Sequence, residues 1–278
     1  MGPNAPQPAP APSSTPRPSP SAGTPAPAAE ARSWEFRYTQ GSRRYRVESE
    51  ATVRLRSDTS QQEAPIHSSA LVTVTTVPSA GGRFSLIATV DSFAIARGDA
   101  IPAPDSAAPL PSRATLRAMM SPTGALEILP SPAAGSCDPA EPLLAIARDL
   151  VVSLPPTLAV GAQWSDSTTT SVCRGGTPVT TGIVRDYLVE GSEKVNGVSA
   201  IRIRRTDTFT LAGASVTNGQ PVAISGRGTG TATLHFDPAA GAYLGGTSES
   251  EAELTVRAGR MESSFTQVVK RRVSADRR

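Results

Sequence analysis

Cysteine carries the most reactive side chain in this sequence, and the chain contains two, Cys137 and Cys173. A thiolate can act as a nucleophile or as a metal ligand, but either use needs suitable partners close by. Neither cysteine has a neighbouring residue at metal-ligand spacing. An even number of cysteines is typical of a disulfide in a protein that is exported from the cytoplasm, and the proline-rich N-terminal segment of this chain is of the kind found in exported proteins. We therefore predict a disulfide between them, with two free thiols as the alternative.

Asp91 and Asp207 occur in similar contexts, each two residues before a phenylalanine in a threonine-rich segment. Two carboxylates that face each other across a cleft could act as general acid and base in a hydrolase. Alternatively, an aspartate at a bulge or bend of a strand can accept hydrogen bonds from backbone N–H groups. Strand alternation places each aspartate on the same face as its phenylalanine. We predict the structural role for both.

The other reactive residues form no recognisable catalytic motif. His67 lies in a polar segment and His235 within a predicted strand, and no nucleophile motif such as Gly-x-Ser-x-Gly occurs. The stretch SGRGTGT at 225–231 lies between strands with no helix after it, so we interpret it as a flexible or bulged strand segment rather than a phosphate-binding loop. We predict no catalytic, cofactor-binding or metal-binding residue, and hence no enzyme activity and no cofactor.

The charge distribution argues against nucleic acid as a partner. The formal net charge is +3, and aromatic residues, which usually accompany a basic nucleic-acid-binding stripe, make up 4% of the chain. The densest basic run is 270–272. We interpret this run as a solvated strand edge that discourages edge-to-edge pairing, with an anionic surface partner as the alternative.

Residues 1–33 are rich in proline, alanine and serine. Proline fixes φ and lacks an N–H donor, so we predict a disordered linker with polyproline II bias, either a spacer or an inert terminus. The segment resembles the linker that follows the lipid-modified cysteine of bacterial lipoproteins. That resemblance implies an extracytoplasmic location, and proximity to a membrane through a lost lipid anchor. We find neither a signal peptide nor an apolar run of about 18 residues.

The remainder is predicted to be mainly β, with an N-terminal half at 34–136 and a C-terminal half at 157–278. Both alternate apolar and polar residues between turn signals such as Asn196-Gly197. In the C-terminal half, Ile201, Ile203, Phe209 and Leu211 share one face of a strand. The other face carries Arg202, Arg204, Thr206, Thr208 and Thr210, and we expect it to be solvated.

Residues 137–156 break this alternation, because their leucines, isoleucine and valines recur at helical spacing. Asp138 is a suitable N-cap, and Pro155-Pro156 would end the helix. The segments 89–98 and 205–214 resemble each other, which indicates two loosely repeated halves. We predict an antiparallel sandwich or a strongly curved half-barrel sheet, with one central α-helix across a face or mouth.

The stretch LPPTLAVGAQWSDS at 154–167 resembles the middle of a family of bacterial envelope proteins, many of them predicted lipoproteins. The shared features are a Leu-Pro pair, a short apolar step and then Gly161-x-x-Trp164. Because no activity is assigned to that family, the resemblance implies a mostly β fold and an envelope location, and no chemistry. We interpret Trp164 as a structural residue in the core.

The leading hypothesis is an extracytoplasmic, non-enzymatic binding module on a proline-rich tether, expected to be a monomer, whose partner is an unknown envelope protein. The alternative is a carrier of lipid or another hydrophobic ligand, because a curved sheet with a helix over its mouth is similar in layout to periplasmic lipoprotein carriers. The carrier hypothesis predicts an apolar ligand cavity lined by Phe84, Leu86, Phe93, Leu143, Leu150, Phe209 and Leu211.

Overall fold

A computed structural model describes residues 33–56, 61–98, 114–129, 140–174, 176–217 and 219–276. The predicted linker before Ser33, the predicted N-cap Asp138 and Cys137 lie outside these ranges. The elements of the described chain are β1 (Ser33–Glu35), β2 (Gly41–Arg56), β3 (Gln61–Pro78), the short 3₁₀ turn η1 (Ala80–Gly82), β4 (Phe84–Arg97), β5 (Thr115–Met120), β6 (Leu126–Ile128), α1 (Glu141–Arg148), β7 (Thr157–Ala159), β8 (Gln163–Arg174), β9 (Thr177–Val195), β10 (Val198–Thr217), β11 (Gln220–Asp237), β12 (Ala242–Ala258) and β13 (Met261–Ala275).

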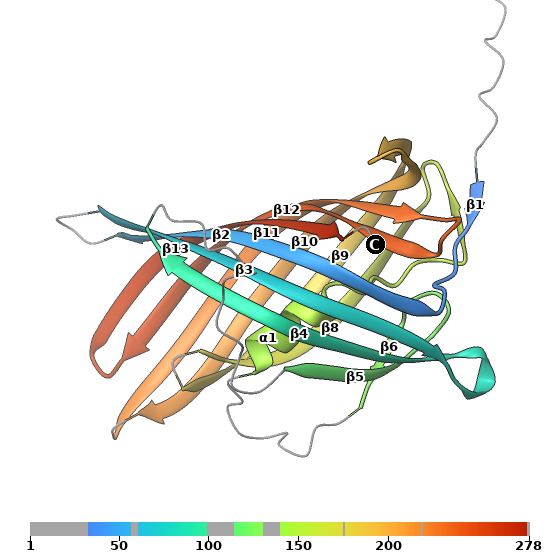
Figure 1. Cartoon of the computed structure of the whole chain (residues 1–278). Coiled ribbons are helices and arrows are strands. Elements are labelled where there is room, and N and C mark those ends of the chain that lie inside the picture. Colours follow the sequence, from blue (N-terminus) through green and yellow to red (C-terminus); the bar gives the residue numbers. More distant parts are fainter. Residues whose placement is uncertain are drawn as a thin grey trace, which may run out of the picture. The chain divides into compact units, whose positions relative to one another are not determined.

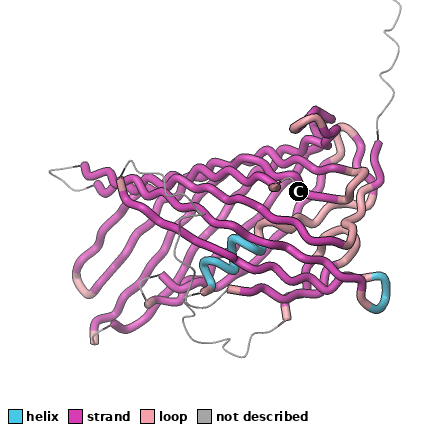
Figure 2. The backbone as a smooth tube through the Cα atoms, in the orientation of Figure 1, coloured by secondary structure: helices cyan, strands magenta, loops and turns pink. Residues whose placement is uncertain are grey.

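One antiparallel sheet dominates the described residues. Its 11 strands follow the order β6-β5-β4-β3-β2-β13-β12-β11-β10-β9-β8 (Figure 1). The two predicted halves therefore belong to a single sheet, because β2 pairs with β13 from Tyr45↔Ala275 to Leu55↔Phe265. The sheet curls around α1 (Figure 2), which decides between the two predicted architectures in favour of the half-barrel. A second sheet contains only β1 and β7.

The strands alternate as predicted, with one face toward α1 and the opposite face toward solvent. On β10, Ile201 and Ile203 are buried, whereas the intervening arginines and threonines are exposed or half-buried. Hairpin turns also occur where the sequence indicates them. Asn196 and Gly197 both adopt positive φ between Val195 and Val198, as a two-residue turn of this type requires.

The helix is shorter than the predicted 137–156. α1 ends at Arg148, and the chain then continues without regular structure until β7. The backbone of this segment finds partners in other parts of the fold, because Thr123 accepts a hydrogen bond from the Leu154 N–H at 2.8 Å and Pro156 accepts one from Phe36 at 3.0 Å. Tertiary hydrogen bonds thus replace the helical ones.

The main core lies between α1 and the surrounding strands. Its aromatic centre includes Phe36, which makes edge-on contacts with Tyr38 and Phe236 at ring-centroid distances of 5.1 and 5.5 Å. All three side chains are buried. In the described part of the chain, no helix is long and apolar enough to cross a membrane.

Candidate functional site

Among the described strands, β6 and β8 are the two edges of the large sheet, and they border a cavity of about 550 Å³ beside α1. We call this cavity the seam cavity. Leu126 and Ile128 line it from β6, and four consecutive residues from Thr168 to Ser171 line it from β8. The remaining walls are α1, the segment that follows it, and the α1-facing sides of β9 and β10. They contribute Glu141, Ala145, Arg148, Asp149, Val151, Val152, Ser153, Ile183, Arg185, Tyr187 and Arg205, and the lining also includes Gly124, which precedes β6, and Asp166 on β8.

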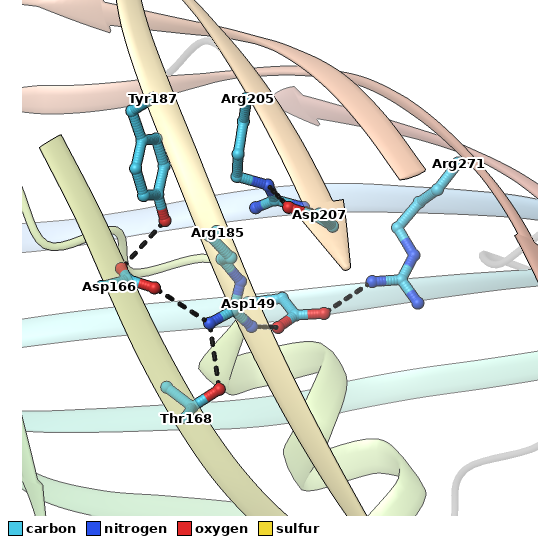
Figure 3. A network of polar contacts seen from close by, with 8 residues as sticks. All are labelled: Asp149, Asp166, Thr168, Arg185, Tyr187, Arg205, Asp207 and Arg271. Atoms are coloured by element: carbon cyan, nitrogen blue, oxygen red, sulfur yellow. Dashed lines mark hydrogen bonds and ion pairs between the residues drawn. The ribbon is translucent and has the colours of Figure 1, made fainter. Parts of the chain in front are cut away.

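A chain of charged and polar contacts crosses the wall of this cavity (Figure 3). Arg185 on β9 lies 3.4 Å from Asp166 on β8 and 3.9 Å from Asp149 at the end of α1, measured between guanidinium nitrogen and carboxylate oxygen. Arg185 also donates a hydrogen bond to Thr168 at 3.0 Å. Tyr187 donates to the Asp166 carboxylate at 3.0 Å, and Asp149 accepts a bond from Arg271 on β13 at 2.8 Å. The network therefore joins the helix to three strands.

A second pair, Arg205 and Asp207, lies next to this network on β10. The Arg205 guanidinium donates to the Asp207 carboxylate at 2.8 Å, and both side chains are largely buried, with 16% and 14% of their area exposed. Burial lowers the pKa of Arg205, but the Asp207 carboxylate together with Tyr187 and Asp149 outweighs burial, and the net shift of this pKa is upward. The Arg205 guanidinium therefore remains charged at neutral pH.

Tyr187 is held in its neutral form at this site. Burial is the main cause that raises its pKa, and the nearby Asp166 carboxylate raises it further. The Tyr187 ring stacks on Trp164 with centroids 4.8 Å apart and an angle of 2° between planes. The hydroxyl can therefore serve as a fixed hydrogen-bond donor but not as a base near neutral pH.

The cavity is balanced in charge. Its lining contains three acidic residues, Glu141, Asp149 and Asp166, and three arginines, Arg148, Arg185 and Arg205. Every one of these arginines has an acidic partner, including Arg148, which lies 3.2 Å from Glu141. The site thus offers hydrogen-bonding groups without a net charge, which suits an uncharged polar ligand better than an ion.

The structure places the seven predicted cavity residues in packed clusters instead of around the seam cavity. Leu86 and Leu150 are buried in the main core, and Phe84, Phe93 and Leu143 pack against it. Leu86 and Leu150 also border a small gap of about 20 Å³. The remaining two, Phe209 and Leu211, belong to a second cluster with Val179, Ala252 and Leu254.

The glycine-rich stretch of β11 makes room for this second cluster. Gly226, Gly228 and Gly230 lie in regular register with β10 and β12, without a bulge. A Cβ atom at Gly228 would lie 2.6 Å from the Cε2 atom of Phe209, so only glycine lets this ring lie flat across the strand. The stretch is a strand segment, as predicted, but the predicted bulge is wrong, because the glycines belong to a regular ladder.

Asp91 and Asp207 do not form a pair. They lie on β4 and β10, with β3, β2, β13, β12 and β11 between them. Asp207 shares the α1-facing side with Phe209, as predicted, whereas Asp91 accepts a hydrogen bond at 2.6 Å from Thr73 on the opposite side. A register shift between Leu71 and Val72 opposite β4 turns Asp91 away from Phe93. The prediction that both aspartates share a face with their phenylalanines is wrong for Asp91.

Trp164 lies on β8, packs against the main core, and donates a hydrogen bond from its indole N–H to Ser153 at 3.3 Å. Cys173 lies near the end of the same strand. Because Cys137 falls outside the described residues, the disulfide remains a prediction.

Neither histidine belongs to the seam cavity. His235 points to the face opposite α1 and lies 2.5 Å from the Glu193 carboxylate. His67 borders a hollow on that face, which Glu50 and Lys270 also line. Among the described residues, no group of three or more histidine, cysteine, aspartate or glutamate side chains could hold a metal ion.

Sequence reasoning missed most of the network, although part of its signal was present. Arg205 and Asp207 occupy alternate positions between Ile203 and Phe209, which places two charges in an apolar stripe. The links to Asp149 and Asp166 carry no comparable signal, because they depend on the order of strands in the sheet.

Comparisons with known proteins add little. No family model and no curated protein matches the chain. Among solved structures, the chain is similar to the crystal structure of Pseudomonas aeruginosa OpdQ, with 8% identity over 85% of this chain and 100% of that chain. The TM-score is 0.27, which carries no argument about function.

Proposed function

We propose that the protein is an extracytoplasmic, non-enzymatic binding module whose ligand occupies the seam cavity. The observation that carries this proposal is the cavity itself. It measures about 550 Å³, within the range of about 300–1,000 Å³ typical of ligand sites, and its lining combines some apolar side chains with many charged and hydroxyl groups. The proline-rich tail and the predicted disulfide support a location outside the cytoplasm, where the tail acts as a spacer.

The arginine–aspartate network supports binding in preference to catalysis. Removing charges from water is costly, and a buried ion pair often stabilises a protein no better than apolar residues of similar size. The lining also holds no histidine, and its one tyrosine stays neutral. A fixed, charge-balanced wall is suited to orienting a polar ligand.

A hydrophobic-ligand carrier is less well supported. A carrier needs an apolar cavity, whereas its seven predicted lining residues contribute to packed clusters. The seam cavity contains charged and hydroxyl side chains on several of its walls, which would disfavour a lipid chain.

The test compares two tryptophan variants of the full chain. Ala145 on α1 lines the seam cavity, so Ala145→Trp fills it without removing a hydrogen-bonding side chain. Ala223 is exposed on the opposite face of β11, which makes Ala223→Trp a matched control. Thermal melts are recorded with a panel of uncharged oligopeptides, oligosaccharides and amino acids.

We expect at least one compound of the panel to raise the melting temperature of the wild-type and Ala223→Trp proteins but not that of Ala145→Trp. An equal shift in both variants would place the binding site elsewhere. The absence of any shift in the wild-type protein would also reject the proposal.

A further inference from the structure

We propose that the ligand of the seam cavity is an extended, uncharged peptide segment of a partner protein, which adds to the edge of β8 as a further strand. This inference rests on the proposed binding function and names the partner class. Its basis is the way in which the cavity contacts β8.

Four consecutive residues of β8, from Thr168 to Ser171, line the cavity. Successive side chains of a strand point to opposite faces of the sheet. Thr168 and Thr170 share the α1-facing side with Ile183, whereas Thr169 and Ser171 point to the other side. A cavity that is lined by consecutive residues of a strand, and not only by every second one, reaches the backbone of that strand, and β8 is an edge of the described sheet. Backbone N–H and C=O groups are therefore exposed to whatever fills it.

The β8 edge is well formed for pairing. β8 runs for 12 residues in continuous register with β9 from Gln163↔Leu188 to Arg174↔Thr177, without a bulge. Among the described strands, β9 is its only partner. Natural proteins protect such edges with proline, lysine, a bulge or an inward-pointing charge, and β8 contains only the last of these, at Asp166, two residues before the stretch that lines the cavity. An edge left open in this way is suited to strand addition by an extended peptide.

The opposite wall specifies the chemistry of the peptide. Leu126 and Ile128 of β6 lie on the α1-facing side of the sheet, because they pair with Met120 and Ala118. Ile128 is 42% exposed. A strand between β6 and β8 would therefore place apolar side chains on the α1-facing side and polar ones on the other. The balanced charge of the lining favours a segment without net charge.

Proline substitution on β8 tests this inference directly. Neighbouring residues of an antiparallel strand direct their backbone groups to opposite sides, so one of Thr169 and Thr170 bonds to β9 and the other faces the cavity. Of Thr169→Pro and Thr170→Pro, the variant that retains the wild-type melting temperature is the one that has lost only the cavity-facing N–H. The other variant loses a ladder bond and serves as a destabilised reference.

The probe is a library of random octapeptides displayed on phage and selected on the full chain. Selected peptides are synthesised and titrated by fluorescence polarisation, each in two N-methylated forms that block the odd or the even amides. We expect one form to bind like the parent and the other to lose about tenfold in affinity, and we expect a similar loss in the thermally stable proline variant. The peptide comparison does not depend on whether a proline variant folds.

Three results would overturn the inference. If selected peptides bind equally in both N-methylated forms but not to Ala145→Trp, the cavity binds ligands without strand addition. If only sugars or amino acids bind in the cavity, the proposed function stands and the peptide does not. If light scattering shows a dimer that the stable proline variant abolishes, the strand that adds to β8 belongs to a second copy of this chain.

Discussion

Tyr38 fixes one wall of the seam cavity, and replacing it with phenylalanine should cost much of the stability of that wall. The Tyr38 hydroxyl donates a hydrogen bond to the Val152 carbonyl at 3.0 Å and accepts one from the Val152 N–H at 3.2 Å. Val152 itself lines the cavity. Both residues are buried, with 8% and 4% exposed area. Tyr38→Phe therefore leaves one donor and one acceptor buried without partners.

The expected loss follows from these two groups. An unsatisfied buried polar group costs about 1–3 kcal/mol, so the two groups together should lower the free energy of unfolding of Tyr38→Phe by about 2–6 kcal/mol. The ring has little room to adjust, because Gly124 lies against it, and a Cβ at that position would be 2.6 Å from the Tyr38 Cε2 atom. Tyr45→Phe is the matched control. The Tyr45 hydroxyl makes a single bond, to the Tyr243 carbonyl at 3.1 Å, so the expected loss is about 1–2 kcal/mol.

The assay is guanidinium unfolding of the full chain, followed by tryptophan fluorescence and circular dichroism. The slope of the transition should stay the same in all three proteins, so that midpoints can be compared. If Tyr38→Phe costs no more than Tyr45→Phe, the hydroxyl does not hold Val152 in place and the reasoning is refuted.

Three further predictions concern the tyrosines, a glycine and the cysteines. All four tyrosines are buried, and burial raises the pKa of Tyr45 to about 12 in the folded protein. The folded state therefore keeps its full stability below pH 10, the ordinary pKa of tyrosine, and loses stability as the pH rises toward 12, because the unfolded chain deprotonates more readily. Phenolate absorbance should change in one step together with unfolding. Gly228→Ala should lower the free energy of unfolding by about 1–3 kcal/mol, because the new methyl group overlaps Phe209, and Phe209→Leu should recover part of the loss. Protein exported to an oxidising compartment should lack the mass of two thiol hydrogens, and the Cys137→Ser variant should retain one reactive thiol at Cys173.

The sequence predicts the local features of this fold well where local rules decide them. Alternation along β10 assigns Ile201 and Ile203 to the buried face, and the Asn196-Gly197 pair marks a hairpin. The length of α1, in contrast, could not be predicted from local rules. Its predicted C-terminal part has helical spacing, but Tyr38 and Thr123 supply hydrogen bonds from distant parts of the chain, and no local pattern reports them.

The candidate site depends more strongly on long-range arrangement. The alternation of side chains along β10 alone places Arg205 and Asp207 on the same face as Ile203, which is the α1-facing side, so this pair could be inferred from sequence. Asp91 shows the limit of that rule, because one register shift between β3 and β4 moves it to the other face. The cavity has no sequence pattern at all, since it exists only because β6 and β8 are the two ends of the sheet.

The connection between the two edge strands explains why the sheet remains open. The chain leaves β6 at Ile128 and enters β8 at Gln163, and the described part of this connection contains α1 and the irregular segment after it, which pack against the inner face. Asp149, at the end of α1, binds Arg185 and Arg271 on two separate strands, so the helix is anchored to the sheet by charge as well as by apolar packing. The Asp149 side chain is 45% exposed, so these ion pairs stay partly solvated and cost less desolvation than fully buried pairs would. These charged groups pair with one another on the α1-facing side, whereas an added strand would bond to the backbone of β8, so the anchor of the helix and the proposed pairing surface use different groups.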